Sequence, residues 1–74
     1  MVNMEIRDRL KKHNLTFGWL INRLEAEGIR TDKSEISSVM AGTRPGPKAD
    51  LIIEKSNEIL DKYDAYVNES RETY

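Results

Sequence analysis

The chain has 74 residues, no cysteine and a formal net charge of −1. This length allows one domain with a small core, and without cysteine that core has neither disulfides nor thiolate metal ligands to stabilise it. The sequence begins with no apolar signal-peptide region and has no run near the roughly 18 apolar residues of a membrane span, so we expect a soluble, cytoplasmic protein with no membrane partner.

The first predicted helix runs from about Met4 to Lys12, and its apolar residues Ile6 and Leu10 share one face. Acidic residues fall in its first turns and lysines in its last turn, where the helix dipole favours each sign of charge. The pair His13-Asn14 is expected to end this helix.

A second helix of about Phe17 to Glu27 is predicted after Thr16, a residue type that suits the N-cap. Gly28 is placed to end this helix in the left-handed conformation. The apolar residues of the segment recur at helical spacing and define one inward face: Phe17, Leu20, Ile21 and Leu24.

A third helix of about Lys33 to Ala41 follows the turn at residues 29–31. Asp32 and Glu35 resemble the capping box that opens a helix. Gly42 is expected to end it, because the following Arg-Pro-Gly-Pro stretch cannot continue a helix. The residues predicted to point inward are Ile36, Val39 and Met40.

The fourth predicted helix starts near Pro47 or Lys48 and extends to Val67, a span of about 30 Å. This length matches the width of the whole domain, so we expect the end of the helix to project or to pack on a second chain. The domain then comprises residues 1–67, and residues 68–74 form a predicted disordered tail. The inward stripe consists of Ile52, Ser56, Ile59, Leu60, Tyr63 and Val67.

Charge is distributed unevenly along the chain. Residues 1–48 carry nine Lys/Arg and six Asp/Glu, a balance of +3, whereas residues 49–74 carry three and seven, a balance of −4. The positive charge of the first two-thirds of the chain is therefore suited to binding phosphate. Charged residues that simply face solvent, with no ligand, would give the same distribution equally well.

Two segments resemble the XRE/Cro family of helix-turn-helix regulators of phages and bacteria. Leu15-Thr16, with Leu20 and Leu24, is similar to the first helix of that motif, and residues 32–42 (DKSEISSVMAG) are similar to its recognition helix. Thr43-Arg44-Pro45 is similar to the exit that follows. The connection between the two helices is longer than is usual for the family. The resemblance implies an all-α, compact bundle of four or five helices that contains a helix-turn-helix and a long C-terminal helix.

The resemblance also implies a function, a transcriptional regulator of a phage-type lysis/lysogeny switch in the bacterial host cytoplasm. Its partner would be double-stranded operator DNA, read by a recognition helix of about residues 33–41. The residues expected to contact bases are Lys33, Ser34, Ser37 and Ser38, each serine having plain solvent exposure as its alternative. The residues expected to contact phosphate are Thr16, Arg30, Arg44 and Lys48.

Trp19 leads to an alternative function. It lies near the side of the second helix opposite the apolar face, where an exposed Trp beside Arg is typical of a protein-binding hot spot. Packing of Trp19 on the first or fourth helix is the other interpretation. The alternative is an antirepressor with the same fold that binds a partner phage repressor and alters its DNA binding. The surface expected to bind that partner consists of Trp19, Asn22, Arg23 and Ala26.

Enzymatic chemistry is not expected, because His13 is the sole histidine, cysteine is absent, and there is no Gly-rich phosphate loop. We expect no cofactor and no metal. The few positive charges near the third helix predict weak binding of DNA by one copy, so a homodimer that reads two half-sites is a further expectation.

Overall fold

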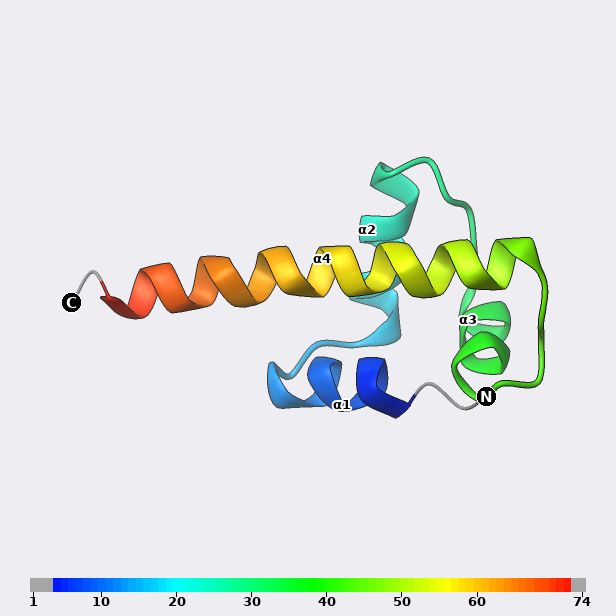
Figure 1. Ribbon diagram of the computed structural model, residues 1–74, viewed down its shortest axis with the longest axis horizontal. Helices are drawn as coiled ribbons and strands as arrows, with labels where there is room; N and C mark the ends of the chain where they lie inside the picture. The colour runs from blue at the N-terminus through cyan, green and yellow to red at the C-terminus, as the bar shows by residue number, and fades with distance from the viewer. Residues whose placement is uncertain (1–3, 73–74) are drawn as a thin grey trace.

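The computed structural model describes the backbone of residues 4–72 and the side chains of residues 5–68, and within that backbone it contains four α-helices and no strand. None of the helices in this described part is both long and apolar enough to cross a membrane. The predicted all-helical bundle with a long C-terminal helix is confirmed, and the first three helices begin and end within one residue of the predicted positions. The elements are α1 (Met4–Lys12), α2 (Phe17–Ala26), α3 (Lys33–Met40) and α4 (Pro47–Glu72) (Figure 1).

The first three helices all end at a residue with a left-handed backbone. These residues are Asn14 (φ 58°), Gly28 (φ 85°) and Gly42 (φ 79°), and asparagine is one of the few non-glycine residues that adopt this conformation readily. At the end of α2, the N–H of Ile29 donates to the carbonyl of Leu24, while the N–H of Gly28 donates to that of Glu25, both at 2.9 Å. This is the Schellman motif, and the same pair of bonds closes α1 and α3.

The starts of α2 and α3 are fixed by side-chain caps. The Thr16 hydroxyl accepts from the N–H of Trp19 at 3.2 Å, and the Asp32 carboxylate accepts from the N–H of Glu35 at 2.7 Å. Each cap satisfies one of the N–H groups that a helix start leaves without an internal partner. The connection between α2 and α3 is anchored as well, because Ile29 within it is only 7% exposed.

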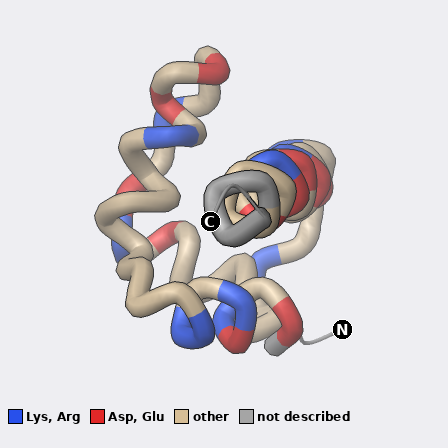
Figure 2. Tube along the Cα trace, turned by 90° about the vertical axis from the view of Figure 1, so that its left-hand side faces the viewer, with Lys and Arg blue, Asp and Glu red and all other residues tan. Residues whose placement is uncertain are grey.

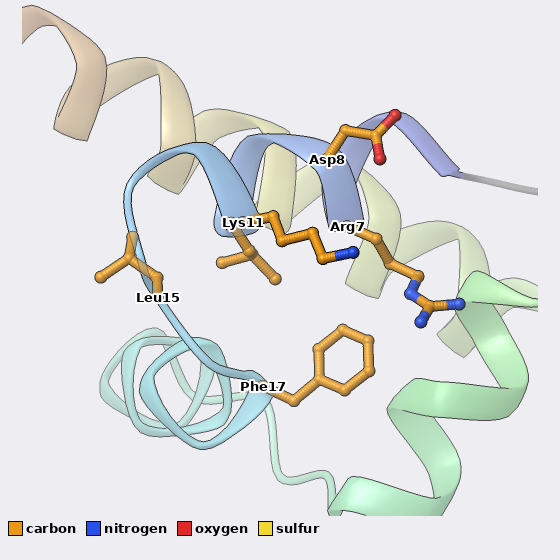
Figure 3. Close-up of a pocket in the computed structure, with 6 residues that line it drawn as sticks. Arg7, Asp8, Lys11, Leu15 and Phe17 are labelled. Carbon is orange, nitrogen blue, oxygen red and sulfur yellow. The ribbon is translucent and has the colours of Figure 1, made fainter.

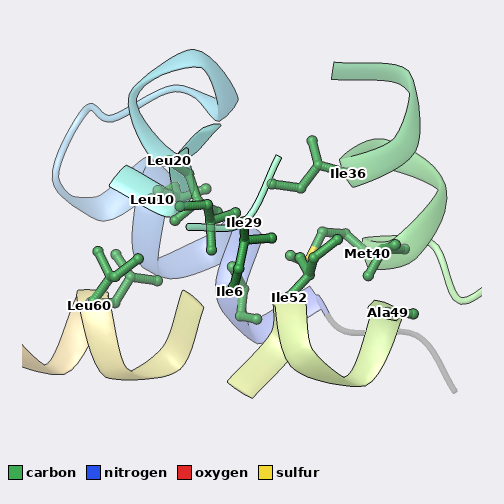
Figure 4. Close-up of a cluster of buried hydrophobic side chains, with 12 residues drawn as sticks. Ile6, Leu10, Leu20, Ile29, Ile36, Met40, Ala49, Ile52 and Leu60 are labelled. Carbon is green, nitrogen blue, oxygen red and sulfur yellow. The ribbon is translucent and has the colours of Figure 1, made fainter. Parts of the chain in front are cut away.

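The core lies where α1, α2, α3 and the first half of α4 meet (Figure 4). Burial of each large apolar side chain contributes about 1.5–3 kcal/mol, and in a chain this short that burial must supply most of the stability. The buried apolar residues are Ile6, Leu10, Leu20, Leu24, Ile29, Ile36, Val39, Met40, Ala49, Ile52, Ile59 and Leu60.

Helix α4 is the longest element, with 26 residues, and it extends well beyond the other three helices (Figure 1). Viewed along its axis, α4 has α2 on one side and α1 on an adjacent side (Figure 2). The expected end at Val67 is wrong, since the helix continues to Glu72. Residues 68–72 are polar but contain neither glycine nor proline, so nothing in the sequence interrupts the helical hydrogen bonds. The last two residues of the expected tail, 73–74, lie outside the described residues.

Ion pairs attach α1 to the second half of α4. The Arg9 guanidinium donates to Asp61 at 2.8 Å and to Asp64 at 2.7 Å, and His13 Nε2 lies 2.5 Å from the Asp64 carboxylate. The hydrogen bond from Arg9 is the main cause that holds the pKa of Asp64 below its ordinary value, and the bond to His13 adds to it. Charged side chains therefore attach the second half of α4 to α1.

Candidate nucleic-acid interface

Helix α3 turns its apolar residues into the core, which leaves a polar face toward solvent. Lys33, Ser34 and Ser37, three of the four residues expected to contact bases, are exposed on that face. The fourth, Ser38, is half-buried, and its carbonyl accepts from both the N–H and the hydroxyl of Thr43 at 3.0 and 3.1 Å. Lys33 and Ser34 thus lie in the first turn of α3, and Ser37 follows one turn later on the same exposed face.

Glu35 forms ion pairs with Arg44 and Lys48, two of the residues expected to contact phosphate. Its carboxylate lies 3.1 Å from Lys48 Nζ and 3.3 Å from the Arg44 guanidinium, and it accepts from the Thr31 hydroxyl at 2.6 Å. The hydrogen bond from Thr31, followed by that from Lys48, lowers the pKa of Glu35 below its ordinary value, so the carboxylate is charged at neutral pH. The cluster links the turn before α3, the loop after it and the start of α4, and its net charge is +1.

The predicted capping box is only half formed. Asp32 caps α3 as expected, but the Glu35 side chain turns to Thr31, Arg44 and Lys48. The physical reason is charge, because a carboxylate gains more from two cations and a hydroxyl than from one backbone N–H.

Thr16 and Arg30 complete the set expected to contact phosphate. The Thr16 oxygen is used as the cap of α2, and its residue is exposed, so its O–H can still donate. Arg30 is exposed in the connection between α2 and α3. Residues 30–48 carry four Lys/Arg and two Asp/Glu, a balance of +2, in the part of the chain that contains α3.

A hollow of about 210 Å³ lies between α1 and the start of α2, and the sequence analysis did not anticipate it. Arg7 and Lys11 extend from α1 over this hollow, which Phe17 closes from the side of α2 (Figure 3). Both cations are exposed and lie one helical turn apart, which is the signal that could have identified them. They place two further positive charges beside the start of α2.

The residues of the alternative, protein-binding surface are not all in one place. Trp19 is half-buried, because its ring packs edge-to-face on Tyr63 of α4 with centroids 5.4 Å apart, and Arg23 lies over it at 5.4 Å. A groove of about 350 Å³ runs between α2 and α4 at this point. Asn22 and Ala26 are exposed but do not line the groove. Its lining residues are Trp19, Arg23, Ile59, Lys62, Tyr63 and Tyr66.

The sequence analysis missed the α4 side of this groove. Tyr63 was assigned to the inward stripe of α4, and Tyr66 was not assigned to any surface. A spacing of three residues on a helix places these two rings side by side, which is the signal that could have revealed the groove.

No group of three or more His, Asp or Glu side chains in the described part of the chain is arranged to hold a metal ion. The chain matches no family model, no curated protein and no solved structure.

Proposed function

We propose that this protein is a transcriptional regulator that binds operator DNA through α3, as part of a phage-type switch in the bacterial cytoplasm. The observation that carries the proposal is the exposed face of α3, where Lys33, Ser34 and Ser37 stand free at the capped end of the helix. Arg30 precedes α3 in the sequence, and Arg44 and Lys48 follow it. The Glu35 carboxylate pairs with both Arg44 and Lys48.

In this proposal the N-terminal half of α3 enters the major groove. Lys33 donates to guanine O6 and N7, while Ser34 and Ser37 donate to or accept from neighbouring base edges. Ser38 contributes less, because it is half-buried. Contacts of this kind discriminate against a wrong base by about 1–3 kcal/mol when their geometry is good.

The phosphate contacts position α3 without reading sequence. Arg30, Arg44 and Lys48 supply the charge, Thr16 supplies a hydroxyl, and Arg7 and Lys11 extend the same function to the α1 side. Glu35 orients Arg44 and Lys48 but offsets one of their charges. Binding by one copy is therefore weak, and we propose that two copies bind two half-sites.

Selection from a random duplex library tests the base-reading role. The wild-type chain is expected to enrich a defined motif, and the double variant Lys33→Ala/Ser37→Ala is expected to bind duplex DNA without enriching it. Both substitutions are on an exposed face, so circular dichroism should show an unchanged helix content. If the double variant enriches the wild-type motif, α3 is not the reading helix.

Glu35→Gln tests the phosphate-binding role. The substitution keeps an acceptor for Thr31 and removes the negative charge beside Arg44 and Lys48, so affinity for duplex DNA should rise about 2- to 10-fold at low salt. An unchanged affinity in a folded variant would remove these two cations from the DNA surface.

The groove between α2 and α4 favours a second candidate function, that of an antirepressor that binds a partner repressor. An exposed Tyr beside a half-buried Trp and an Arg is the composition of a binding hot spot. Binding of a purified partner repressor that is lost on Tyr66→Ala, with no binding of duplex DNA by the wild type, would favour this function over the first.

A further inference from the structure

The floor of the groove between α2 and α4 is apolar and preformed. Trp19 and Tyr63 meet edge-to-face at an interplanar angle of 72°, and Ile59 lies beside them at 9% exposure. Tyr66 forms the outer end of the groove and is 66% exposed, an unusual degree for so large a ring. Because Tyr63 also packs on His13 at 4.9 Å, the walls are held in place before any ligand arrives.

The rim of the groove is positively charged on both sides. Arg23 projects from α2 and Lys62 from α4. Within the side chains described for residues 5–68, neither of these two cations forms an ion pair. Both therefore have donors available for a ligand.

The nearby carboxylates of α4 do not neutralise this rim. Asp61 and Asp64 are bound by Arg9, and Glu58 pairs with Lys55 at 3.3 Å. The groove thus combines an aromatic floor with two cations that no described carboxylate pairs with.

We propose that this groove binds a segment of a partner protein that inserts an apolar side chain beside carboxylates. The apolar side chain fills the space over Trp19 and Tyr63, and the carboxylates pair with Arg23 and Lys62. Preformed walls lower the entropy that binding must offset, and Trp, Tyr and Arg are the residues that most often dominate such interfaces.

Nucleic acid fits the groove less well than an acidic protein segment does. A DNA duplex presents phosphates and sugars to such a surface, and these offer no apolar side chain for the floor formed by Trp19, Ile59 and Tyr63. The proposal deepens the second candidate function by giving the chemistry of its partner. It does not depend on DNA binding, because the groove and the α3 surface share no residue.

Three synthetic peptides of about 15 residues test the proposal against the full chain. The first is an amphipathic helix with Leu and Phe on one face and Glu elsewhere, the second has Lys in place of every Glu, and the third has Ala in place of every Leu and Phe. In a titration of 15N-labelled protein, the first peptide should shift the Trp19 indole N–H and the amides of Arg23 and Lys62. It should bind at least about tenfold more tightly than either of the others.

Charge reversal then localises the site. Arg23→Glu/Lys62→Glu should weaken binding of the first peptide at least about tenfold and weaken binding of duplex DNA by much less, since both residues are exposed and neither is in the α3 surface. The reciprocal variant Arg30→Glu should leave peptide affinity unchanged and weaken DNA binding. Tyr66→Ala serves as a second groove variant, because this exposed ring can be removed without unfolding the chain.

Three results would overturn the proposal. One is equal binding of the Glu and Lys peptides, and another is a set of shifts that maps to α3 and not to the groove. The third is a mass of about 17.2 kDa, twice the 8.6 kDa of one chain, with the groove protected from all three peptides. That last result would make a second copy of this chain the occupant.

Discussion

The two halves of α4 are held in the fold by different forces. The first half, up to Leu60, places four apolar side chains in the core, including Ile52 and Leu60 at 0% exposure. Among residues 61–68 of the second half, no side chain is fully buried, and the contacts are the ion pairs of Asp61 and Asp64 and the packing of Tyr63. The first half therefore stabilises the platform that positions α3, while the second half forms one wall of a groove.

This difference follows from the surroundings of one continuous helix. All three other helices contact α4, whereas the contacts of residues 61–64 come from α1, through Arg9 and His13, and from α2, through Trp19. Stability and the proposed partner binding are consequently separable along α4, and substitutions in the two halves should have different effects.

The largest effect is expected in the first half. Ile52→Ala should lower the free energy of unfolding by about 2–5 kcal/mol, because it leaves a cavity in a fully buried site. Leu51→Ala, at the adjacent position with 41% exposure, is the matched control and should cost less than about 1 kcal/mol. Urea denaturation followed by circular dichroism measures both.

The total stability of a domain of this size is about 4–11 kcal/mol, so Ile52→Ala can leave the chain largely unfolded. Ile52→Val, with an expected loss of about 0.5–1.5 kcal/mol, keeps the comparison measurable. Equal losses for the substitutions at 51 and 52 would contradict the burial pattern of α4.

Substitution of Ser56 is expected to raise stability. Among the described side chains, Ser56 is the buried polar residue of the core. Its hydroxyl oxygen has no hydrogen-bond partner within the described part of the chain. Ser56→Ala should therefore raise the free energy of unfolding by about 1 kcal/mol, since a desolvated and unpaired group is removed. A loss of stability would show that the hydroxyl has a partner in solution.

A smaller, pH-dependent effect is expected in the second half. Arg9 and His13 keep the pKa of Asp64 below its ordinary value, so its contribution is fully present above the unfolded pKa of about 3.9. That contribution is lost as pH falls through the lowered folded pKa. Asp64→Asn should cost less than about 1 kcal/mol at pH 7, because the carboxylate is partly exposed.

The test is denaturant unfolding of the wild type and Asp64→Asn at pH 7 and at acidic pH. The difference between them should shrink in acid. Glu35, whose pKa is lowered too, is present in both proteins, so its loss cancels in that difference. A difference independent of pH would mean that the ion pairs do not hold this half of α4.

The smallest effect on stability is expected at Tyr66. Its side chain is 66% exposed, so Tyr66→Ala should change the free energy of unfolding by less than about 0.5 kcal/mol. Thermal unfolding measures this value, and a large loss would place the ring in the core and not in a binding groove.

Local sequence signals predicted the helices because local bonds decide where they begin and end. Thr16 and Asp32 cap α2 and α3, and Asn14, Gly28 and Gly42 end the first three helices. The end of α4 was misjudged because a polar segment without glycine or proline carries no stop signal.

The sites were less predictable, because their contacts join residues that are distant in sequence. Glu35 meets Lys48 and Arg44, and Trp19 meets Tyr63, through packing that no local spacing reveals. The exposed face of α3 was predictable. Its apolar residues share one side of the helix, so Lys33, Ser34 and Ser37 must lie on the other side.

The most direct test of the DNA-binding proposal is the affinity of the chain for a labelled random-sequence duplex, measured by fluorescence anisotropy at about 50 mM and about 200 mM salt. With at least two to three phosphates neutralised, by Arg30, Arg44 and Lys48, affinity should fall at least about 10- to 40-fold over this range, and further if Arg7 and Lys11 also bind phosphate. The absence of binding at the lower salt, or binding that salt does not change, would contradict a DNA-facing α3 and leave the groove between α2 and α4 as the functional surface.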